Sequence, residues 1–332
     1  MKNIAIVFIV LAFLAAACSN QKAKKETKSA VEESTQKTQA YLGLKEGGEW
    51  VWVTKSSGKE QWEYQGGKFK SVDQIIVDEK HTDHSFDIQF EGPGWESDKI
   101  GYRLYLDWRN AIDIFGKKTD TLVLQNVGRD GFDSYHEISG WGVDVLKVGE
   151  SLGMGSLAFW DGEKAVRVEK TDGLKSSVEN SPEKSTVIVD YPGWEINNIK
   201  TDLHTNLEIE PGSYLTKYTA KLSEELPNLA TGIVIHPETE KAIFDDIKPG
   251  WTCLATFGKQ TLQNDLLGMC VFVKTDQLIE EANDGLSHVL VVKPENKELT
   301  YYFGAAWQQD ASGVMSMDDF KALLKEQSRF IK

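Results

Sequence analysis

Short apolar runs rich in β-branched and aromatic residues recur along most of the chain, and clusters of glycine, proline, asparagine and aspartate separate them. Runs of this length between turn residues predict strands, and many such strands with few helices predict an all-β fold, a large antiparallel β-sandwich. Short helical pieces are expected at 276–282 and just before Leu267. The strands are predicted at residues 51–53, 69–77, 86–90, 100–106, 122–127, 165–168, 187–189, 203–209, 215–222, 230–235, 269–273, 289–292 and 299–303.

One clear helix is predicted near the C-terminus. Ser316 followed by Asp319 resembles a capping box, in which side chains satisfy the first backbone N–H groups of a helix. Phe320, Leu323 and Leu324 then form an apolar helix face. We expect this helix to pack on the sandwich as a closing element.

The first residues have the composition of an export signal. Lys2 precedes an apolar run at 4–14, which is too short for a stable membrane span. Three alanines then lead into Cys18, a pattern that resembles a bacterial lipoprotein signal over residues 1–18 with lipidation at Cys18. Simple secretion with cleavage nearby is the alternative.

A polar segment without aromatic residues follows at 19–40, and it cannot bury enough apolar surface to fold. We therefore expect a flexible tether there and a single β-sandwich domain at 41–332. The residues directly after Cys18 are not acidic, which favours a lipid anchor on the periplasmic side of the outer membrane.

The net charge of −14 bears on the partner. No basic cluster lies outside the tether, which argues against a nucleic-acid partner. An acidic glycan is compatible with this charge, because a few local arginines set the field inside a cleft. The ten tryptophans cluster with glycine and tyrosine in loops. This clustering is common in carbohydrate-handling proteins, and aromatic-rich β cores share it. Cys253 and Cys270 are compatible with a disulfide or with two buried thiols.

The stretch 91–118 combines a strand with charged and aromatic side chains. Alternation from Ile100 to Leu106 places Tyr102, Leu104 and Leu106 on one face and Gly101, Arg103 and Tyr105 on the other.

Trp95 and Glu96 follow a turn just before this strand, and Arg109 follows it. A sugar acid suits this set, since rings stack on sugars and Arg103 or Arg109 binds a carboxylate in bidentate fashion. A buried strand with ordinary surface ion pairs is the alternative.

Tyr135 and His136 follow a polar turn and precede Trp141, which glycines flank. Histidine titrates near neutrality, and tyrosine acts as an acid or base when a cation lowers its pKa. The pair is a candidate for proton transfer, and a hydrogen-bonded loop histidine is the alternative.

The remaining histidines supply further candidates. His81 and His84 bracket a carboxylate and would share a divalent metal if a turn brought them together, although their spacing matches no zinc signature. His204 lies within a predicted strand and His236 at a strand end. Lys147 precedes a glycine-rich loop whose spacing excludes a phosphate-binding loop.

The residues 95–118 and 135–160 together resemble a known family, the bacterial domain of unknown function 4861. The resemblance covers most of the chain after the tether. It implies a fold like the galactose-mutarotase supersandwich and a setting in polysaccharide utilisation. It further implies action on uronic-acid-containing oligosaccharides, by elimination of water or of a sugar.

Elimination requires a cation on the carboxylate, a base for the neighbouring proton and an acid for the leaving oxygen. Arg103 or Arg109 would supply the cation, with Lys147 or a histidine-bound metal as substitutes. Tyr135 or His136 would be the base, and His236 or His204 the acid.

Three other function classes stay open. The first is a non-catalytic glycan-binding lipoprotein, and the second is a sugar mutarotase or epimerase, although a fold does not determine function. The third is a hydrolase using Glu96 with Asp98 or Asp144 as paired carboxylates.

Overall fold

The computed structural model describes residues 36–129 and 133–332. The predicted signal sequence, the predicted lipidation site Cys18 and most of the predicted tether lie outside the described residues. The folded part starts with strand β1 (Thr38–Tyr41), so residues 38–40 of the predicted tether belong to the fold instead. No helix in the described part of the chain has the length and apolarity needed to cross a membrane.

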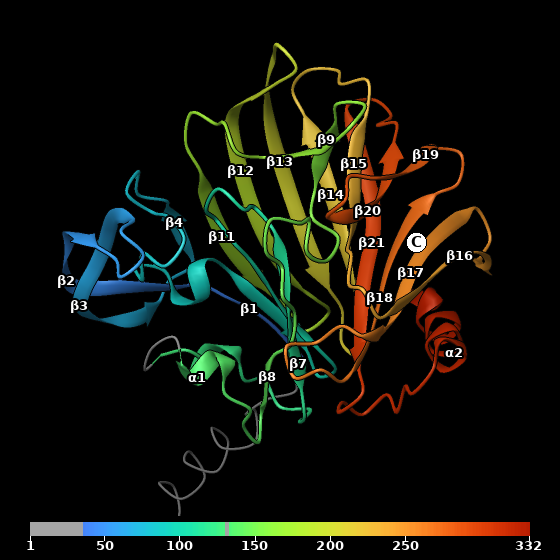
Figure 1. Cartoon of the computed structure of the whole chain (residues 1–332), viewed down its shortest axis with the longest axis horizontal. Coiled ribbons are helices and arrows are strands. Elements are labelled where there is room, and N and C mark those ends of the chain that lie inside the picture. The colour runs from blue at the N-terminus through green and yellow to red at the C-terminus, as the bar shows by residue number, and fades with distance from the viewer. Residues whose placement is uncertain (1–35, 130–132) are drawn as a thin grey trace, which may run out of the picture. The chain divides into compact units, whose positions relative to one another are not determined.

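The largest sheet in the described part has nine strands and runs across the back of Figure 1. Neighbouring strands pair antiparallel throughout. In spatial order they are β16 (Thr239–Lys248), β17 (Trp251–Lys259), β18 (Leu266–Lys274), β21 (Glu298–Trp307), β14 (Leu215–Leu222), β13 (Ile199–Ile209), β12 (Ser185–Ile196), β11 (Lys175–Asn180) and β4 (Gln74–Ile76).

The residue pattern of each strand matches what covers it. β13 alternates buried and accessible residues because one of its faces meets solvent, whereas β18 is buried at nearly every position because both of its faces are covered. Helix α2 (Met317–Gln327) covers the outer face, where the ring of Phe320 lies 6.2 Å from that of Phe257 and packs over Gly268.

Two five-stranded sheets cover the inner face of the nine-stranded sheet. Two contacts join the first of these sheets to the nine-stranded sheet. The indole of Trp95 donates to the hydroxyl of Thr216 on the nine-stranded sheet at 2.9 Å, and the ring of Tyr102 lies 5.5 Å from that of Phe303 on the same large sheet. The first sheet contains β1, β5 (Gly94–Ser97), β6 (Gly101–Leu104), β7 (Ile112–Lys117) and β8 (Gly142–Asp144). The second contains β10 (Ala165–Arg167), β9 (Ala158–Trp160), β15 (Leu229–Val234), β20 (Ser287–Val292) and β19 (Leu278–Asn283).

This architecture confirms an all-β fold built from large antiparallel sheets, with a short C-terminal helix. The predicted cap is present as well, since the Ser316 hydroxyl accepts a hydrogen bond from the backbone N–H of Asp319. Cys253 and Cys270 lie on the paired strands β17 and β18 as buried free thiols.

A separate two-stranded hairpin lies at the left of Figure 1. It consists of β2 (Gly43–Thr54) and β3 (Glu60–Ser71). Short helical turns complete the described chain: η1 (Gln89–Glu91), η2 (Leu124–Asn126), α1 (Asp133–His136) and η3 (Ser328–Phe330).

Four predicted elements are wrong. The helical piece expected just before Leu267 is a turn at 262–264, and strand β18 starts at Leu266. The strand at 86–90 is a turn followed by η1, because Phe86 and Phe90 have φ values of 62° and 43° that no strand accommodates. The strand at 122–127 contains η2 instead. The helical piece at 276–282 is largely strand β19, which pairs with β20.

Candidate functional site

A cavity of about 320 Å³ lies where the base of the β2–β3 hairpin meets η1 and α1. Both aromatic rings and charged groups line it, which is the mixed character of small-molecule sites. The lining residues are Lys45, Gly66, Gly67, Phe69, Phe86, Ile88, Phe90, Glu91, Arg103, Gly128, Arg129, Tyr135 and His136.

Tyr135 and His136 of α1 both reach this cavity. The Tyr135 ring packs against Phe90 and Phe115, each 5.7 Å away between ring centres. Its buried hydroxyl has no hydrogen-bond partner among the described residues. Burial raises the pKa of this phenol well above its ordinary value, so Tyr135 stays protonated at neutral pH and is a proton donor rather than a base.

His136 is half-buried and is positioned by a carboxylate. Its Nε2 lies 3.2 Å from Oδ2 of Asp144, a buried residue at the end of β8. A carboxylate beside the imidazole fixes its orientation and stabilises its protonated form. The arrangement suits a general base.

Arg103 lies on β6 with its side chain on the face that the alternation predicts. Its guanidinium donates to Asp113 Oδ2 at 2.7 and 3.0 Å, to the Tyr105 hydroxyl at 2.7 Å and to Asp144 Oδ2 at 3.2 Å. Two carboxylates therefore balance its charge, and its donors are already engaged. Arg103 is suited to hold Asp144 and the neighbouring rings in place. The predicted role of binding a substrate carboxylate does not fit these contacts.

The carboxyl of Asp113 is fully buried within this group. Burial and the neighbouring Asp144 carboxylate raise its pKa to about 6, against the opposing effect of Arg103. The Asp113 carboxyl therefore takes up a proton in the mildly acidic range.

Rings and guanidiniums stack beside the cavity. The Arg103 Cζ atom lies 4.2 Å from the ring centre of Tyr135 and 4.6 Å from that of Tyr105. Arg109 approaches Tyr105 more closely, at 3.7 Å. These cation–π contacts fix the orientation of the side chains behind the cavity wall.

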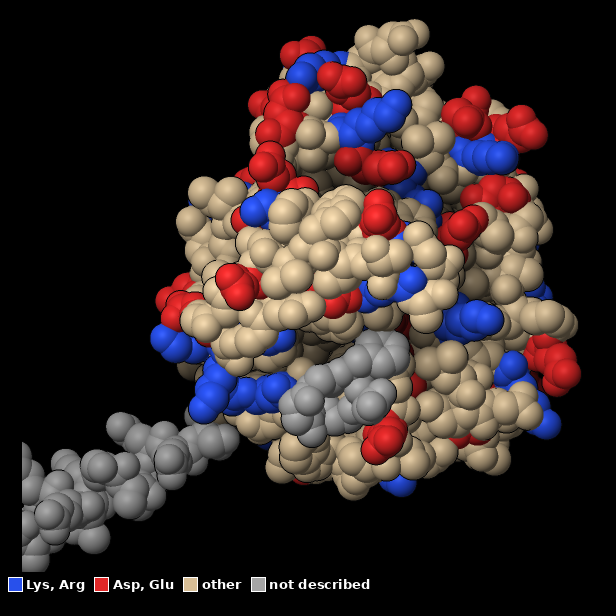
Figure 2. Space-filling model, turned by 60° about the vertical axis from the view of Figure 1, so that its left-hand side comes forward, with Lys and Arg blue, Asp and Glu red and all other residues tan. Residues whose placement is uncertain are grey.

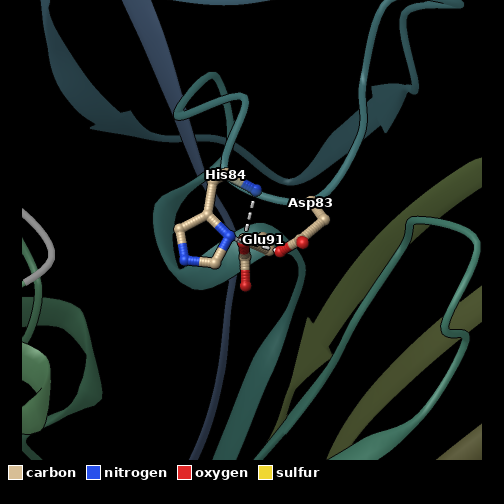
Figure 3. A group of neighbouring side chains, drawn as sticks. All are labelled: Asp83, His84 and Glu91. Carbon is tan, nitrogen blue, oxygen red and sulfur yellow. Dashed lines mark hydrogen bonds and ion pairs between the residues drawn. The ribbon is translucent and has the colours of Figure 1, made fainter. Parts of the chain in front are cut away.

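A cluster of potential metal ligands lies next to the cavity. The side chains of Asp83, His84 and Glu91 converge in Figure 3, and one ligand atom from each lies within 4.8 Å of the others. Arg109 Nη2 lies 3.2 Å from Asp83 Oδ1 and 2.9 Å from Glu91 Oε2, and it also pairs with Asp107. This guanidinium already supplies the positive charge for both carboxylates. The cluster is therefore better explained as a salt-bridge network than as a metal-binding site.

His81 and His84, the predicted metal pair, have different partners. Nδ1 of His81 lies 2.8 Å from Asp87, whereas Nδ1 of His84 bonds Asp83. Among the described residues, the cluster of potential ligands includes His84 and not His81.

Lys45 and Arg129 are the cations of the cavity that sequence reasoning missed. Neither has a carboxylate ion-pair partner among the described residues. Lys45 donates a hydrogen bond to the backbone carbonyl of Tyr64, and Arg129 donates one to that of Phe69. Burial lowers the pKa of Lys45. The position of Arg129 in the turn just before Tyr135 was a usable signal, whereas nothing near Lys45 in the sequence indicated its role.

Trp95 and Glu96, expected at the substrate, lie in the core with no exposed surface. Glu96 binds the buried ammonium of Lys117 at 2.5 Å and accepts hydrogen bonds from the backbone N–H groups of Val123 and Leu124. Neither side chain reaches a solute. The hydrolase alternative therefore loses one member of its carboxylate pair.

Four other predicted site residues lie away from this cavity. Trp141 and Lys147 are exposed and do not line it. His204 pairs with Asp190 at 2.6 Å and lines another groove, of about 620 Å³, along β12 and β13. His236 follows β15 near Lys147, and burial together with the Lys147 charge lowers its pKa.

Figure 2 shows acidic and basic side chains interspersed on the face that it presents, without segregation into one charged patch. A charged ligand would therefore be selected by local groups such as Lys45 and Arg129 rather than by a broad surface field.

Comparison with known proteins adds two matches. No curated protein sequence matches the chain. Among solved structures, a 4-alpha-glucanotransferase from Thermococcus litoralis is similar over 70% of this chain and 39% of its own, with 11% identity and a TM-score of 0.33. A family model described as a domain of unknown function, DUF4861, matches residues 6–332.

Proposed function

The chain belongs to the DUF4861 family, and we propose that it acts on uronic-acid-containing oligosaccharides by β-elimination. The leaving group is water in a dehydratase or a sugar in a lyase. The observation that carries the proposal is one cavity lined by a histidine on a carboxylate, a buried phenol and two cations without carboxylate partners among the described residues.

Lys45 and Arg129 are the proposed carboxylate-binding groups. Their positive charges stabilise the negative charge that develops on the uronate carboxylate when its neighbouring C5 proton is removed. Phe69, beside Lys45 at 5.3 Å, offers an apolar ring to the sugar face. These two cations replace Arg103 and Arg109 of the sequence-based hypothesis, whose donors are engaged by protein carboxylates.

His136 is the proposed base. Asp144 orients the imidazole through Nε2 and stabilises the positive charge that the ring gains when it takes the C5 proton. The electron pair of the broken C5–H bond forms the C4=C5 double bond.

Tyr135 is the proposed acid. Its high pKa keeps the proton on the phenol until the C4–O bond breaks, when the hydroxyl protonates the leaving oxygen. One proton is taken at C5 and one is given at the C4 oxygen, so the products are an unsaturated sugar and water, or an unsaturated sugar and a shortened oligosaccharide. The phenolate then recovers its proton from His136 or solvent.

Export as a lipoprotein is a second part of the proposal. Its support is the apolar run at 4–14 followed by Cys18. A substrate brought into the cell envelope would be accessible to a protein anchored on the periplasmic side.

Incubation of the full chain with a panel of uronic-acid oligosaccharides tests the proposal. The expected result is loss of one water, or splitting into two fragments, together with new ultraviolet absorbance from the enol ether. Splitting by addition of water would indicate a hydrolase, and an isomer of unchanged mass a mutarotase or epimerase. Measurable binding without any product would establish a glycan-binding protein instead.

A further inference from the structure

The β2–β3 hairpin presents two aromatic pairs directly across its strands. Trp50 lies opposite Tyr64 with ring centres 5.4 Å apart, and Trp52 lies opposite Trp62 at 5.3 Å. Because side chains alternate along a strand, all four rings occupy one face of the hairpin. Trp52 is the most accessible of them, with 52% of its surface exposed.

A lysine adds positive charge to this face. Lys80 Nζ lies 4.8 Å from the ring centre of Trp62 and 5.9 Å from that of Trp50. It forms no ion pair with a carboxylate in the described part of the chain. A cation beside accessible indole rings matches a sugar that carries a carboxylate, since the rings contact the sugar face and the ammonium pairs with the acid.

The same hairpin also forms part of the cavity wall. Lys45, Gly66, Gly67 and Phe69, near its base, line the cavity. Trp50 lies five positions after Lys45 on β2, a distance of about 17 Å along an extended strand. An oligosaccharide of several units that extends from the cavity along the hairpin would be long enough to reach the rings.

Stabilisation of the hairpin is the competing explanation for the rings. Cross-strand aromatic pairs strengthen a two-stranded ribbon, which is marginally stable alone. That accounts for Trp50, Trp62 and Tyr64, which are partly buried. It does not account for the exposed surface of Trp52 or for a lysine without a carboxylate partner among the described residues.

We propose that Trp52, Trp62 and Lys80 form a secondary site that binds further units of an acidic glycan chain. The choice of an acidic glycan rests on the proposed function, but binding at the hairpin does not require catalysis in the cavity. The site would retain long chains and contribute little to the binding of a single unit.

Affinity gel electrophoresis of the full chain tests this proposal, with polygalacturonate, alginate or a neutral glucan in the gel. The wild-type chain should be retarded by at least one acidic polymer and not by the neutral glucan. The variants Trp52→Ala and Lys80→Gln should each weaken that retardation about tenfold. Trp108→Ala, an exposed tryptophan elsewhere, and Lys68→Gln, an exposed lysine of the same hairpin, are the matched controls.

Lys80→Gln leaves all four rings in place, so it remains informative if Trp52→Ala disturbs the hairpin. Retardation of both variants equal to wild type would overturn the proposal, as would absence of retardation by either acidic polymer. Retardation that depends on Trp52 and Lys80 in a chain that converts no oligosaccharide would sustain the secondary site while refuting the elimination reaction.

Discussion

The guanidinium carbon of Arg103 lies 4.2 Å from the ring centre of Tyr135, so a buried cation faces a phenol whose hydroxyl has no hydrogen-bond partner among the described residues. The same arginine donates to Asp144, which in turn pairs with His136. One side chain therefore positions both members of the proposed acid–base pair.

Replacing Arg103 with methionine should lower the free energy of unfolding by about 3–5 kcal/mol, because it leaves the buried Asp113 and Asp144 without their cation. Urea denaturation measures this loss. Arg329→Met, at an exposed arginine near the C-terminus, should change it by less than about 0.5 kcal/mol. Equal stability of the two variants would show that the Arg103 network contributes nothing to folding.

Asp113 should make the stability depend on pH around 6. Its pKa is about 6 in the folded protein and 3.8 ordinarily, so its contribution is fully present below pH 3.8 and is lost as the pH rises through 6. Relative to Asp113→Asn, the wild-type free energy of unfolding should therefore fall between pH 4.5 and 7.5, by on the order of 2 kcal/mol.

Urea denaturation of both proteins across this range checks the prediction. Asp318→Asn, an exposed carboxyl at the start of α2, provides the control and should retain the wild-type profile. A constant difference between wild type and Asp113→Asn at every pH would contradict the shifted pKa.

Substitution His136→Ala should reduce turnover of a uronic-acid oligosaccharide by about 10²–10⁴-fold, the usual contribution of a general base. His204→Ala is a matched control, because His204 also pairs with an aspartate but lies at the other groove. It should retain wild-type turnover. Initial rates and unfolding curves of both variants separate a catalytic effect from a folding defect, and equal rates for the two would remove His136 from the mechanism.

Strand β1 should contribute to the stability of the fold, although the sequence predicts a flexible tether at its first residues. Asn180 accepts from the Ala40 backbone N–H at 2.7 Å and donates to the Ala40 carbonyl at 3.0 Å. Asn180→Ala should therefore cost about 1–3 kcal/mol in the free energy of unfolding. A chain starting at Tyr41 should also melt at a lower temperature than one starting at Gln36. Identical melting temperatures would place the start of the cooperative unit after β1.

Local patterns predicted part of the fold correctly. Alternation placed Arg103 and Tyr105 together on the face opposite Tyr102, because strand geometry depends only on neighbouring residues. The cap at Ser316 is local in the same way. By contrast, the turn at 86–90 was not predictable from its apolar residues, since contacts with other segments determine its positive φ values.

The site was predicted only where its residues are close in sequence. Tyr135 and His136 were recognised as a pair, but Lys45 reaches the cavity from a hairpin far away in the chain. The burial of Trp95 and Glu96 could not be read from residue type, because a tryptophan and a carboxylate suit a sugar site as well as a packed core with a buried lysine partner.

The fate of the C5 hydrogen tests the elimination most directly. A uronic-acid oligosaccharide carrying deuterium at C5 should give an ultraviolet-absorbing product that has lost the label, and the labelled substrate should react more slowly if proton removal limits the rate. Products that retain the deuterium and lack the new absorbance would contradict base attack at C5 and with it the proposed function.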